Sequence, residues 1–454
     1  MTYKDFIAGK RIIDRPSGLE EIPPLNPQLF DFQRDIVSWA LRRGRAAIFA
    51  DCGMGKTPMQ LEWARHIPGR VLIVTPLAVA SQTCREAEKF GIDGVKYLRA
   101  DDHKTQIVVT NYEMIDRFCP FDFEGVVLDE SSILKSYTGK FRNKLIGEWG
   151  DVNYRLAATA TPAPNDFMEL GSHSEFIGAM TRTDMLSHFF VHDGGETQKW
   201  RLKGHAESEF WRWLCEWAVM IRKPSDLGYE DGDFLLPQLH IAQTTVDASP
   251  DAAGMLFAME AKTMSERRDA RKTSVGERVN AVADMVNASD QPWLIWCDLN
   301  SESEALRKAI NGAVEVKGSD AQEVKEQRLL GFTNGSIRVL VTKPSIAGWG
   351  LNWQHCSHMA FTGLSDSYEQ FYQAVRRCWR FGQDTDVNVY VVTSSTEGAV
   401  VANIKRKEKD SERMAAMMVE HMADLNAENI KGTQRKDKSY KPENEIIIPN
   451  FLNI

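Results

Sequence analysis

Residues 50–57 read Ala-Asp-Cys-Gly-Met-Gly-Lys-Thr, a glycine-rich segment suited to binding phosphate groups. The apolar run 46–49 precedes it and a helical pattern follows it, which predicts a strand, a tight loop and a helix. In such a loop, backbone N–H groups and the helix N-terminus point at the phosphates, Lys56 contacts the β and γ oxygens, and Thr57 binds magnesium. The segment predicts a site for ATP or GTP.

The first glycine of the general phosphate-loop pattern is replaced by Ala50. Gly53 and Gly55 remain, so the turn can still form. Gly53, Met54 and Gly55 are therefore predicted to bind the nucleotide.

Two adjacent carboxylates follow a second apolar run, 126–128. At such a strand end, Asp129 is expected to hold magnesium through its water shell, and Glu130 to polarise the water that attacks the γ-phosphate. An apolar run that ends in Asp-Glu is common by itself, and its position after a phosphate loop makes it informative.

Two series of short apolar runs alternate with helical patterns, which predicts an α/β fold with two lobes, each built on a parallel sheet with crossover helices. The first series covers 46–50, 70–75, 106–110, 125–128 and 154–158, and the second covers 293–297, 313–316, 336–341, 357–361 and 387–392.

The segment between the two series is rich in tryptophan, histidine and charge. Phe210, Trp211 and Trp217 have spacings that suit an amphipathic helix that buries its rings, an interpretation favoured over stacking on bases. The histidines and Cys215 match no metal-ligand spacing. We expect lobe 1 at 1–238 with a helical extension at about 178–235, lobe 2 at 239–400, and a charged helical, partly flexible tail at 401–454.

The chain has 454 residues, 43% of them hydrophobic, and a net charge of −8, so any contact with nucleic acid must come from a local groove. No signal peptide and no run of the ~18 apolar residues needed for a membrane span is evident, which predicts a cytoplasmic protein without membrane contact. Seven cysteines without paired C-x-x-C spacing predict reduced thiols, with no metal beyond magnesium.

The order of these motifs resembles that of the superfamily-two helicase-type ATPases, and specifically their Swi/Snf-type branch, over most of the chain. In that branch the phosphate loop also reads Ala-Asp-x-Gly-x-Gly-Lys-Thr. Phe32-Gln33 resembles the segment in which a glutamine reads adenine, and Thr159-Ala160-Thr161-Pro162 resembles the Thr-Gly-Thr-Pro segment that couples hydrolysis to lobe movement. The resemblance implies two tandem RecA-like lobes, each a parallel sheet flanked by helices, that use ATP and Mg²⁺.

The second lobe carries two further resemblances. Residues 345–352 resemble the family's Ala-Gly-Gly-x-Gly-Leu-Asn loop, which places Gly350 at the nucleotide, although Trp349 displaces a glycine. Residues 373–383 resemble Gln-Ala-x-x-Arg-x-x-Arg-x-Gly-Gln, and Gln373 is expected to take part in coupling.

Two arginines of this last segment are candidates for catalysis. Arg377 and Arg380 are three residues apart, so they are expected to share a helix face and to act across the interlobe cleft as arginine fingers. Arg376 falls off that face and is expected to pair structurally.

Nucleic acid is expected to cross both lobes, bound through its phosphates near Thr75, Pro76, Thr110 and Thr342. The resemblance implies translocation on duplex DNA. The alternatives are a strand-separating helicase on DNA or RNA, and an ATP-switched DNA-binding scaffold with little turnover, which two departures from the family pattern, Ser132 in place of a histidine and Trp349, motivate. The compact form resembles small bacteriophage or prophage members, which suggests phage or host replication and recombination proteins as partners.

Overall fold

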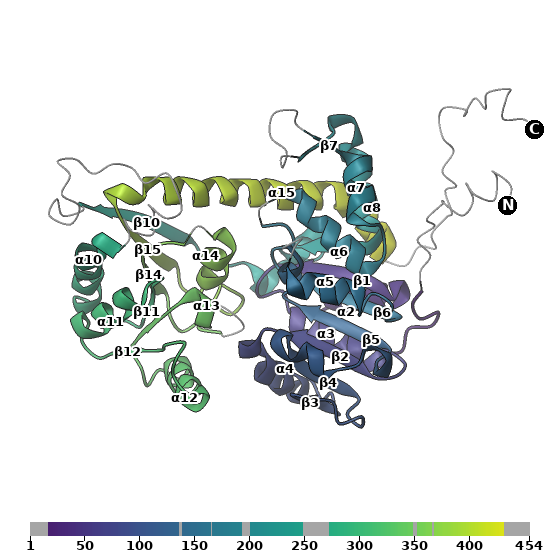
Figure 1. Cartoon of the computed structure of the whole chain (residues 1–454), viewed down its shortest axis with the longest axis horizontal. Helices are drawn as coiled ribbons and strands as arrows, with labels where there is room; N and C mark the ends of the chain where they lie inside the picture. Colours follow the sequence, from purple (N-terminus) through teal and green to yellow (C-terminus); the bar gives the residue numbers. More distant parts are fainter. Residues whose placement is uncertain are drawn as a thin grey trace, which may run out of the picture.

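The computed structural model describes residues 17–135, 139–164, 166–192, 200–247, 272–347, 352–365 and 367–430. Two separate parallel sheets, each flanked by helices, form two lobes along the chain (Figure 1). This architecture confirms the predicted α/β fold with tandem RecA-like lobes. No helix within the described ranges is long and apolar enough to cross a membrane.

Lobe 1 contains a seven-stranded sheet with the order β3-β4-β2-β5-β6-β1-β9, and its strand pairs are all parallel. Alternate residues of β1 enter two different core clusters, Phe49 one and Ile48 the other, because helices cover both faces. Its strands are β1 (Arg45–Ala50), β2 (Val71–Thr75), β3 (Val95–Tyr97), β4 (Ile107–Asn111), β5 (Gly125–Asp129), β6 (Tyr154–Ala158) and β9 (Ala218–Ile221). Its helices include α2 (Asp31–Arg43), α3 (Lys56–His66), α4 (Leu77–Lys89), α5 (Lys140–Gly147) and α6 (Leu170–Ile177).

Lobe 2 contains a six-stranded parallel sheet with the order β10-β15-β14-β11-β13-β12. Its strands are β10 (Leu239–Val246), β11 (Trp293–Trp296), β12 (Ala313–Glu315), β13 (Val339–Thr342), β14 (His358–Thr362) and β15 (Val387–Ser394). Its helices are α10 (Val275–Asn287), α11 (Asn300–Ala309), α12 (Gln322–Thr333), α13 (Pro344–Ala347) and α14 (Tyr368–Val375). Every strand expected from the sequence is present, and β3, β9 and β10 are additional.

The segment expected as a helical extension at about 178–235 is only partly helical, so that expectation is corrected. It forms α7 (Arg182–Phe189), an antiparallel hairpin of β7 (Phe190–His192) and β8 (Trp200–Leu202), and α8 (Glu207–Trp217). It then returns to the main sheet as β9, beside β1. The rings of Phe210, Trp211 and Trp217 are fully buried, which confirms their predicted place in the core.

A long helix, α15 (Gly398–Ile430), begins directly after the last strand of lobe 2 and runs across both lobes (Figure 1). Val400 and Ile404 belong to the core of lobe 2, whereas Ala415 and Met418 belong to a core cluster of lobe 1. The helical part of the tail expected at 401–454 is present as α15, and this helix packs against α8, β9 and α2. The basic stretch after residue 430 lies outside the described residues.

His173 on α6 lies fully buried beneath the sheet of lobe 1. Its Nε2 is 3.0 Å from the hydroxyl of Ser131, and its ring packs edge-on against Phe49. Burial lowers the pKa of His173 to about 4, so the ring is neutral at physiological pH.

Replacing Met418 by alanine tests whether α15 is an integral part of lobe 1. The side chain is fully buried, so we expect Met418→Ala to lower the free energy of unfolding by about 2–5 kcal/mol, measured by chemical denaturation. Met417→Ala, at the neighbouring partly buried position, is the matched control and should cost clearly less. An unchanged stability for Met418→Ala would contradict the packing of α15 on lobe 1.

The buried, neutral His173 predicts a loss of stability on acidification. The unfolded chain binds a proton near the ordinary pKa of 6.5, whereas the folded chain does so only near 4, so stability falls as pH falls between these values. Between pH 7.5 and 5.5 this linkage lowers the free energy of unfolding by about 1.3 kcal/mol. His173→Gln lacks this proton linkage. The difference in the free energy of unfolding between wild type and variant should therefore be about 1.3 kcal/mol smaller at pH 5.5 than at pH 7.5, measured by chemical denaturation at both pH values. A difference independent of pH would refute this assignment.

Candidate active site

The phosphate loop connects the end of β1 to the start of α3 at Lys56. Gly53 and Gly55 have φ angles of +92° and +81°, which glycine adopts without strain. A Cβ on Gly55 would lie 2.2 Å from Nε2 of Gln33, and one on Gly53 would lie 3.0 Å from the backbone nitrogen of Phe381 in lobe 2. Both glycines are therefore needed for the turn and for the close approach of its neighbours.

Gln33 is buried on α2 against this loop. Its Nε2 donates to the carbonyl of Met54 at 3.0 Å, and its side-chain oxygen accepts from the N–H of Phe30 at 3.0 Å. Lys56 Nζ donates to the carbonyl of Ala50 at 3.0 Å, at the mouth of the loop. The predicted adenine and phosphate residues thus come together at one end of the sheet.

The two carboxylates lie at the same edge of the sheet, where β5 ends. Asp129 is buried, and its Oδ1 accepts from Nε2 of Gln60 at 2.7 Å, while its backbone carbonyl accepts from the hydroxyl of Tyr112 at 2.7 Å. Glu130 is partly buried and has a φ of +53°, a strained value for a residue other than glycine. Gln60 was not among the site residues predicted from the sequence, although it lies four residues after Lys56 on the same helix.

Removal from water raises the pKa of both Asp129 and Glu130 above the ordinary values. The positive charges of Lys56 and Arg377 oppose this effect. Because Lys56 belongs to lobe 1 and Arg377 to lobe 2, the carboxylates are compensated by charges from both lobes.

Hydrogen bonds connect Glu130 to lobe 2 through the Thr159–Thr161 segment. The Thr159 hydroxyl donates to Glu130 Oε2 at 3.3 Å and accepts from the N–H of Thr161 at 3.2 Å. The Thr161 hydroxyl donates to Oε1 of Glu369 on α14 at 3.3 Å, and Lys135 forms an ion pair with the same carboxylate. The sequence did not point to Glu369, which is buried between the lobes.

Three side chains of α14 and its C-terminal end, Glu369, Tyr372 and Arg376, face lobe 1. Their spacing of three and four residues places them on one side of a helix. The Tyr372 hydroxyl donates to Oδ1 of Asp51 in the phosphate loop, and Nη2 of Arg376 lies 3.0 Å from Oδ2 of the same aspartate.

The expectation that Arg377 and Arg380 share a helix face is wrong, because α14 ends at Val375 and both lie in the turn that follows. Arg377 is buried, and its Nε donates to the carbonyl of Gln373 at 2.9 Å, while Arg380 donates to the side-chain oxygen of Asn352. Arg376 pairs structurally, as expected, with the phosphate loop as its partner. Contacts with lobe 1 at this turn override the local helical preference.

The donors and acceptors at this edge fit ATP and Mg²⁺. Gln373 Nε2 and Arg380 Nε are buried nitrogen atoms without a hydrogen-bond partner. Together with Lys56 they form a donor-rich, cationic surface suited to phosphate oxygens. Thr57 in the first turn of α3 and the carboxylate of Asp129 supply oxygen ligands of the kind that magnesium prefers.

Three threonines were expected to contact the phosphates of nucleic acid. Their side chains are fully buried, and their hydroxyls donate to carbonyl groups. These bonds run from Thr75 to Pro76 at 3.1 Å, from Thr110 to Leu98 at 2.9 Å, and from Thr342 to Val316 at 3.3 Å. Phosphate contacts through these hydroxyls are therefore ruled out in this arrangement, because a hydroxyl at the end of a buried strand must be satisfied internally. Pro76, at the start of α4, is partly exposed.

Gly350 and Trp349 lie outside the described residues. Ser132, which stands where the family has a histidine, is buried. Position 132 therefore carries no histidine, but Nε2 of His173 on α6 lies 3.0 Å from the hydroxyl of the neighbouring Ser131.

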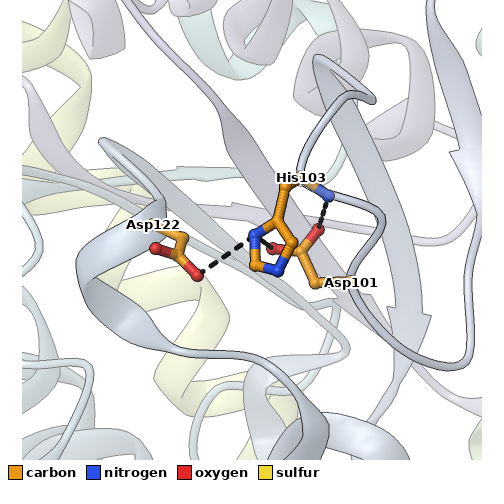
Figure 2. A group of neighbouring side chains, drawn as sticks. All are labelled: Asp101, His103 and Asp122. Atoms are coloured by element: carbon orange, nitrogen blue, oxygen red, sulfur yellow. Dashed lines mark hydrogen bonds and ion pairs between the residues drawn. The ribbon is translucent and has the colours of Figure 1, made fainter.

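A second polar group lies at the opposite edge of the lobe 1 sheet, before the starts of β4 and β5 (Figure 2). Nδ1 of His103 is 3.3 Å from Asp101 and 3.6 Å from Asp122, a grouping that could hold a metal ion. Arg70 already pairs with Asp101 through two hydrogen bonds, and this charge lowers the pKa of that carboxyl. The group is thus compensated by arginine and lies away from the phosphate loop.

Comparisons with known proteins show what the chain is similar to. The helicase conserved C-terminal domain matches residues 277–382, which include the arginine segment of lobe 2. The chain is 23% identical over 435 residues to the uncharacterized ATP-dependent helicase YqhH of Bacillus subtilis (strain 168), covering 83% of this chain and 76% of that protein.

Two solved structures that resemble this chain come from a bacterium and an archaeon. A fragment of a putative HsdR subunit of a type I restriction enzyme from Vibrio vulnificus YJ016 has a TM-score of 0.50 at 14% identity, over 82% of this chain and 64% of that one. The Sulfolobus solfataricus SWI2/SNF2 ATPase core in complex with dsDNA has a TM-score of 0.43 at 16% identity, over 91% of this chain and 99% of that one.

The family model covers lobe 2 and the similarity to the helicase extends over most of the chain, while the site joins a phosphate loop, an Asp-Glu pair and an arginine segment across two RecA-like lobes. The chain is a nucleic-acid-dependent ATPase, and its motif order resembles that of the Swi/Snf-type branch of the superfamily-two helicases.

Proposed function

We propose that this ATPase is a translocase that moves along double-stranded DNA, driven by ATP hydrolysis between its two lobes. The observation that carries the proposal is the contact of lobe 2 with both halves of the site. Glu369 connects to Glu130 through the two threonines, and Arg376 and Tyr372 hold Asp51 of the phosphate loop. A change at the nucleotide is thereby transmitted to the position of lobe 2.

In this proposal Gln33 reads adenine and the loop of Gly53, Met54 and Gly55 surrounds the phosphates, with Lys56 at the β and γ oxygens. Thr57 and Asp129 would hold Mg²⁺, which neutralises phosphate charge when bound. Gln60 keeps the Asp129 carboxylate oriented by its hydrogen bond.

Glu130 is the proposed general base. Its burial raises its pKa, so its carboxylate is a stronger base than an exposed glutamate, and the charges of Lys56 and Arg377 oppose this shift. The hydrogen bond from Thr159 orients it. Arg377 and Arg380 are the proposed fingers that stabilise charge on the transferring phosphoryl, and Thr159, Thr161 and Gln373 couple this chemistry to lobe movement.

Duplex DNA is the proposed track, supported by the Swi/Snf-type motif order. With the hydroxyls of Thr75, Thr110 and Thr342 buried, phosphate contacts would come from backbone N–H groups at the strand ends, including the partly exposed Pro76–Leu77 turn at the start of α4. Such binding is independent of sequence and weakens with salt. The second candidate is a strand-separating helicase, which the similarity to the uncharacterized ATP-dependent helicase of Bacillus subtilis favours.

The proposed domain limits are 1–238 for lobe 1, 239–400 for lobe 2 and 401–454 for the tail, and α15 begins at the end of lobe 2 and continues into the tail. These limits fall between β9 and β10, where the chain passes from one sheet to the other. We place the protein in the cytoplasm of a bacterial or phage-infected cell, with replication or recombination proteins as partners; its resemblance to small bacteriophage members supports this setting.

Steady-state ATP hydrolysis with magnesium at low salt, without polymer and with duplex DNA, single-stranded DNA or single-stranded RNA, tests the proposal. We expect stimulation chiefly by duplex DNA, and Lys56→Ala should abolish ATP binding and give the background rate. Stimulation chiefly by single strands would favour the helicase. ATP binding without turnover on any polymer would refute the motor and favour the scaffold.

The role of Glu130 predicts a separation of binding from hydrolysis. Glu130→Gln should lower kcat by about 10²-fold or more, while ATP and DNA affinity are retained, because only proton acceptance is lost. Glu304→Gln, on the exposed surface of lobe 2, is the control and should behave as wild type. Normal ATP hydrolysis by Glu130→Gln would refute the assignment of Glu130 as the general base. Normal ATP hydrolysis by Arg380→Ala would refute the assignment of Arg380 as an arginine finger.

A further inference from the structure

The turn that carries the proposed fingers is attached to the phosphate loop by a residue with no assigned role in the chemistry. Arg376 is 3% exposed, and its Nη2 lies 3.0 Å from Oδ2 of Asp51 and also donates to the carbonyl of Cys52. One guanidinium group of lobe 2 thus binds both the side chain and the backbone of the loop.

Asp51 is fixed by contacts from both lobes. Its Oδ1 accepts from the N–H of Cys52 at 2.6 Å and from the hydroxyl of Tyr372. With Oδ2 facing Arg376, the carboxylate bridges the backbone of its own loop and two side chains of lobe 2. Its position therefore depends on both the loop conformation and the docking of lobe 2.

The arginine turn needs such a counter-charge. Three guanidinium groups, those of Arg376, Arg377 and Arg380, occur within five residues. Burial and repulsion by the neighbouring arginines lower the pKa of Arg380 to about 10. Removing like charges from water without an anion nearby is costly, and Asp51 supplies an anion that pairs with Arg376 in this turn.

The Arg376 side chain is also held from within lobe 2. Its guanidinium lies 4.9 Å from the ring centre of Trp379 and 5.8 Å from that of Tyr372. These aromatic contacts aim the group at lobe 1 before it meets Asp51.

We propose that Arg376 and Asp51 are a positioning pair, which forms when the lobes close and places Arg377 and Arg380 opposite the phosphate loop. The inference rests on the proposed role of these two arginines as fingers. Arg376 acts through the loop and not on the nucleotide in this proposal, because its Nη2 pairs with Asp51 and Cys52. Closure of the lobes is then coupled to the conformation of the phosphate loop.

A double-mutant cycle tests the pair with Arg376→Gln, Asp51→Asn and the double variant, by ATP hydrolysis of the full chain with saturating duplex DNA. Each single change should lower kcat about tenfold or more, and the double variant should be no worse than the more impaired single variant, because the same interaction is lost. The KM for ATP should change less than about threefold, since the pair does not bind nucleotide. Arg307→Gln, an exposed arginine of lobe 2 paired with Glu315, is the control and should match wild type.

Hydrogen exchange of the phosphate-loop amides, without nucleotide, tests the same pair independently of turnover. Peptides covering residues 50–57 should exchange faster in both single variants than in wild type, and to the same extent in the double variant. Tyr372→Phe removes one hydrogen bond to Asp51 but no charge, so it should show a smaller effect in the same direction and keeps the test open if Arg376→Gln fails to fold.

The outcomes separate this proposal from the function on which it rests. Effects on kcat that multiply in the double variant, a raised KM in Arg376→Gln alone, or unchanged exchange would overturn the positioning pair even if wild type is an active motor. A wild-type chain that binds ATP without turnover would refute the motor, and the exchange experiment would then decide the pair by itself.

Discussion

The active site depends on the compensation of two carboxylates that have been removed from water. Asp129 is buried and Glu130 partly buried at the end of β5, where an uncompensated charge would be costly. Lys56 supplies one nearby positive charge from lobe 1 and Arg377 supplies another from lobe 2. Lobe 1 alone therefore contains an incomplete candidate site, and the contact between the lobes is part of the electrostatics of that site.

Two helices connect the lobes in different ways. Helix α14 meets lobe 1 through charged and hydroxyl groups, namely Glu369, Tyr372 and Arg376, which can exchange these partners for water. Helix α15 places apolar side chains in both cores, so separating it from lobe 1 would expose Met418 and Ala415 to water. The polar contacts are suited to repeated opening, whereas α15 limits how far the lobes can separate.

Local patterns in the sequence predicted the strands and the phosphate loop because continuous apolar runs and glycine-rich turns are local signals. They did not predict β9, a four-residue apolar strand directly after an amphipathic helix, because so short a run has no diagnostic period. The local patterns also predicted a helix that includes Arg377 and Arg380, whereas α14 ends at Val375. The turn that follows is held by the contact of Arg376 with Asp51, more than three hundred residues away in the sequence. The spacing of Glu369, Tyr372 and Arg376 was the available signal for an interlobe face, but their partners could not be read from the chain.

The departure at Ser132 bears on whether the protein turns over ATP or only switches. The family pattern has a histidine at that position, and here Ser132 is buried. Here the connection runs instead from Glu130 through Thr159 and Thr161 to Glu369, and Lys135 neutralises its far end. The neutral, buried His173 lies against Ser131 and the core, so it supports the strand end and takes no part in this connection. A continuous path of hydrogen bonds thus joins the proposed base to lobe 2 without a histidine at position 132. This path weakens the case for a decayed site and supports an active motor.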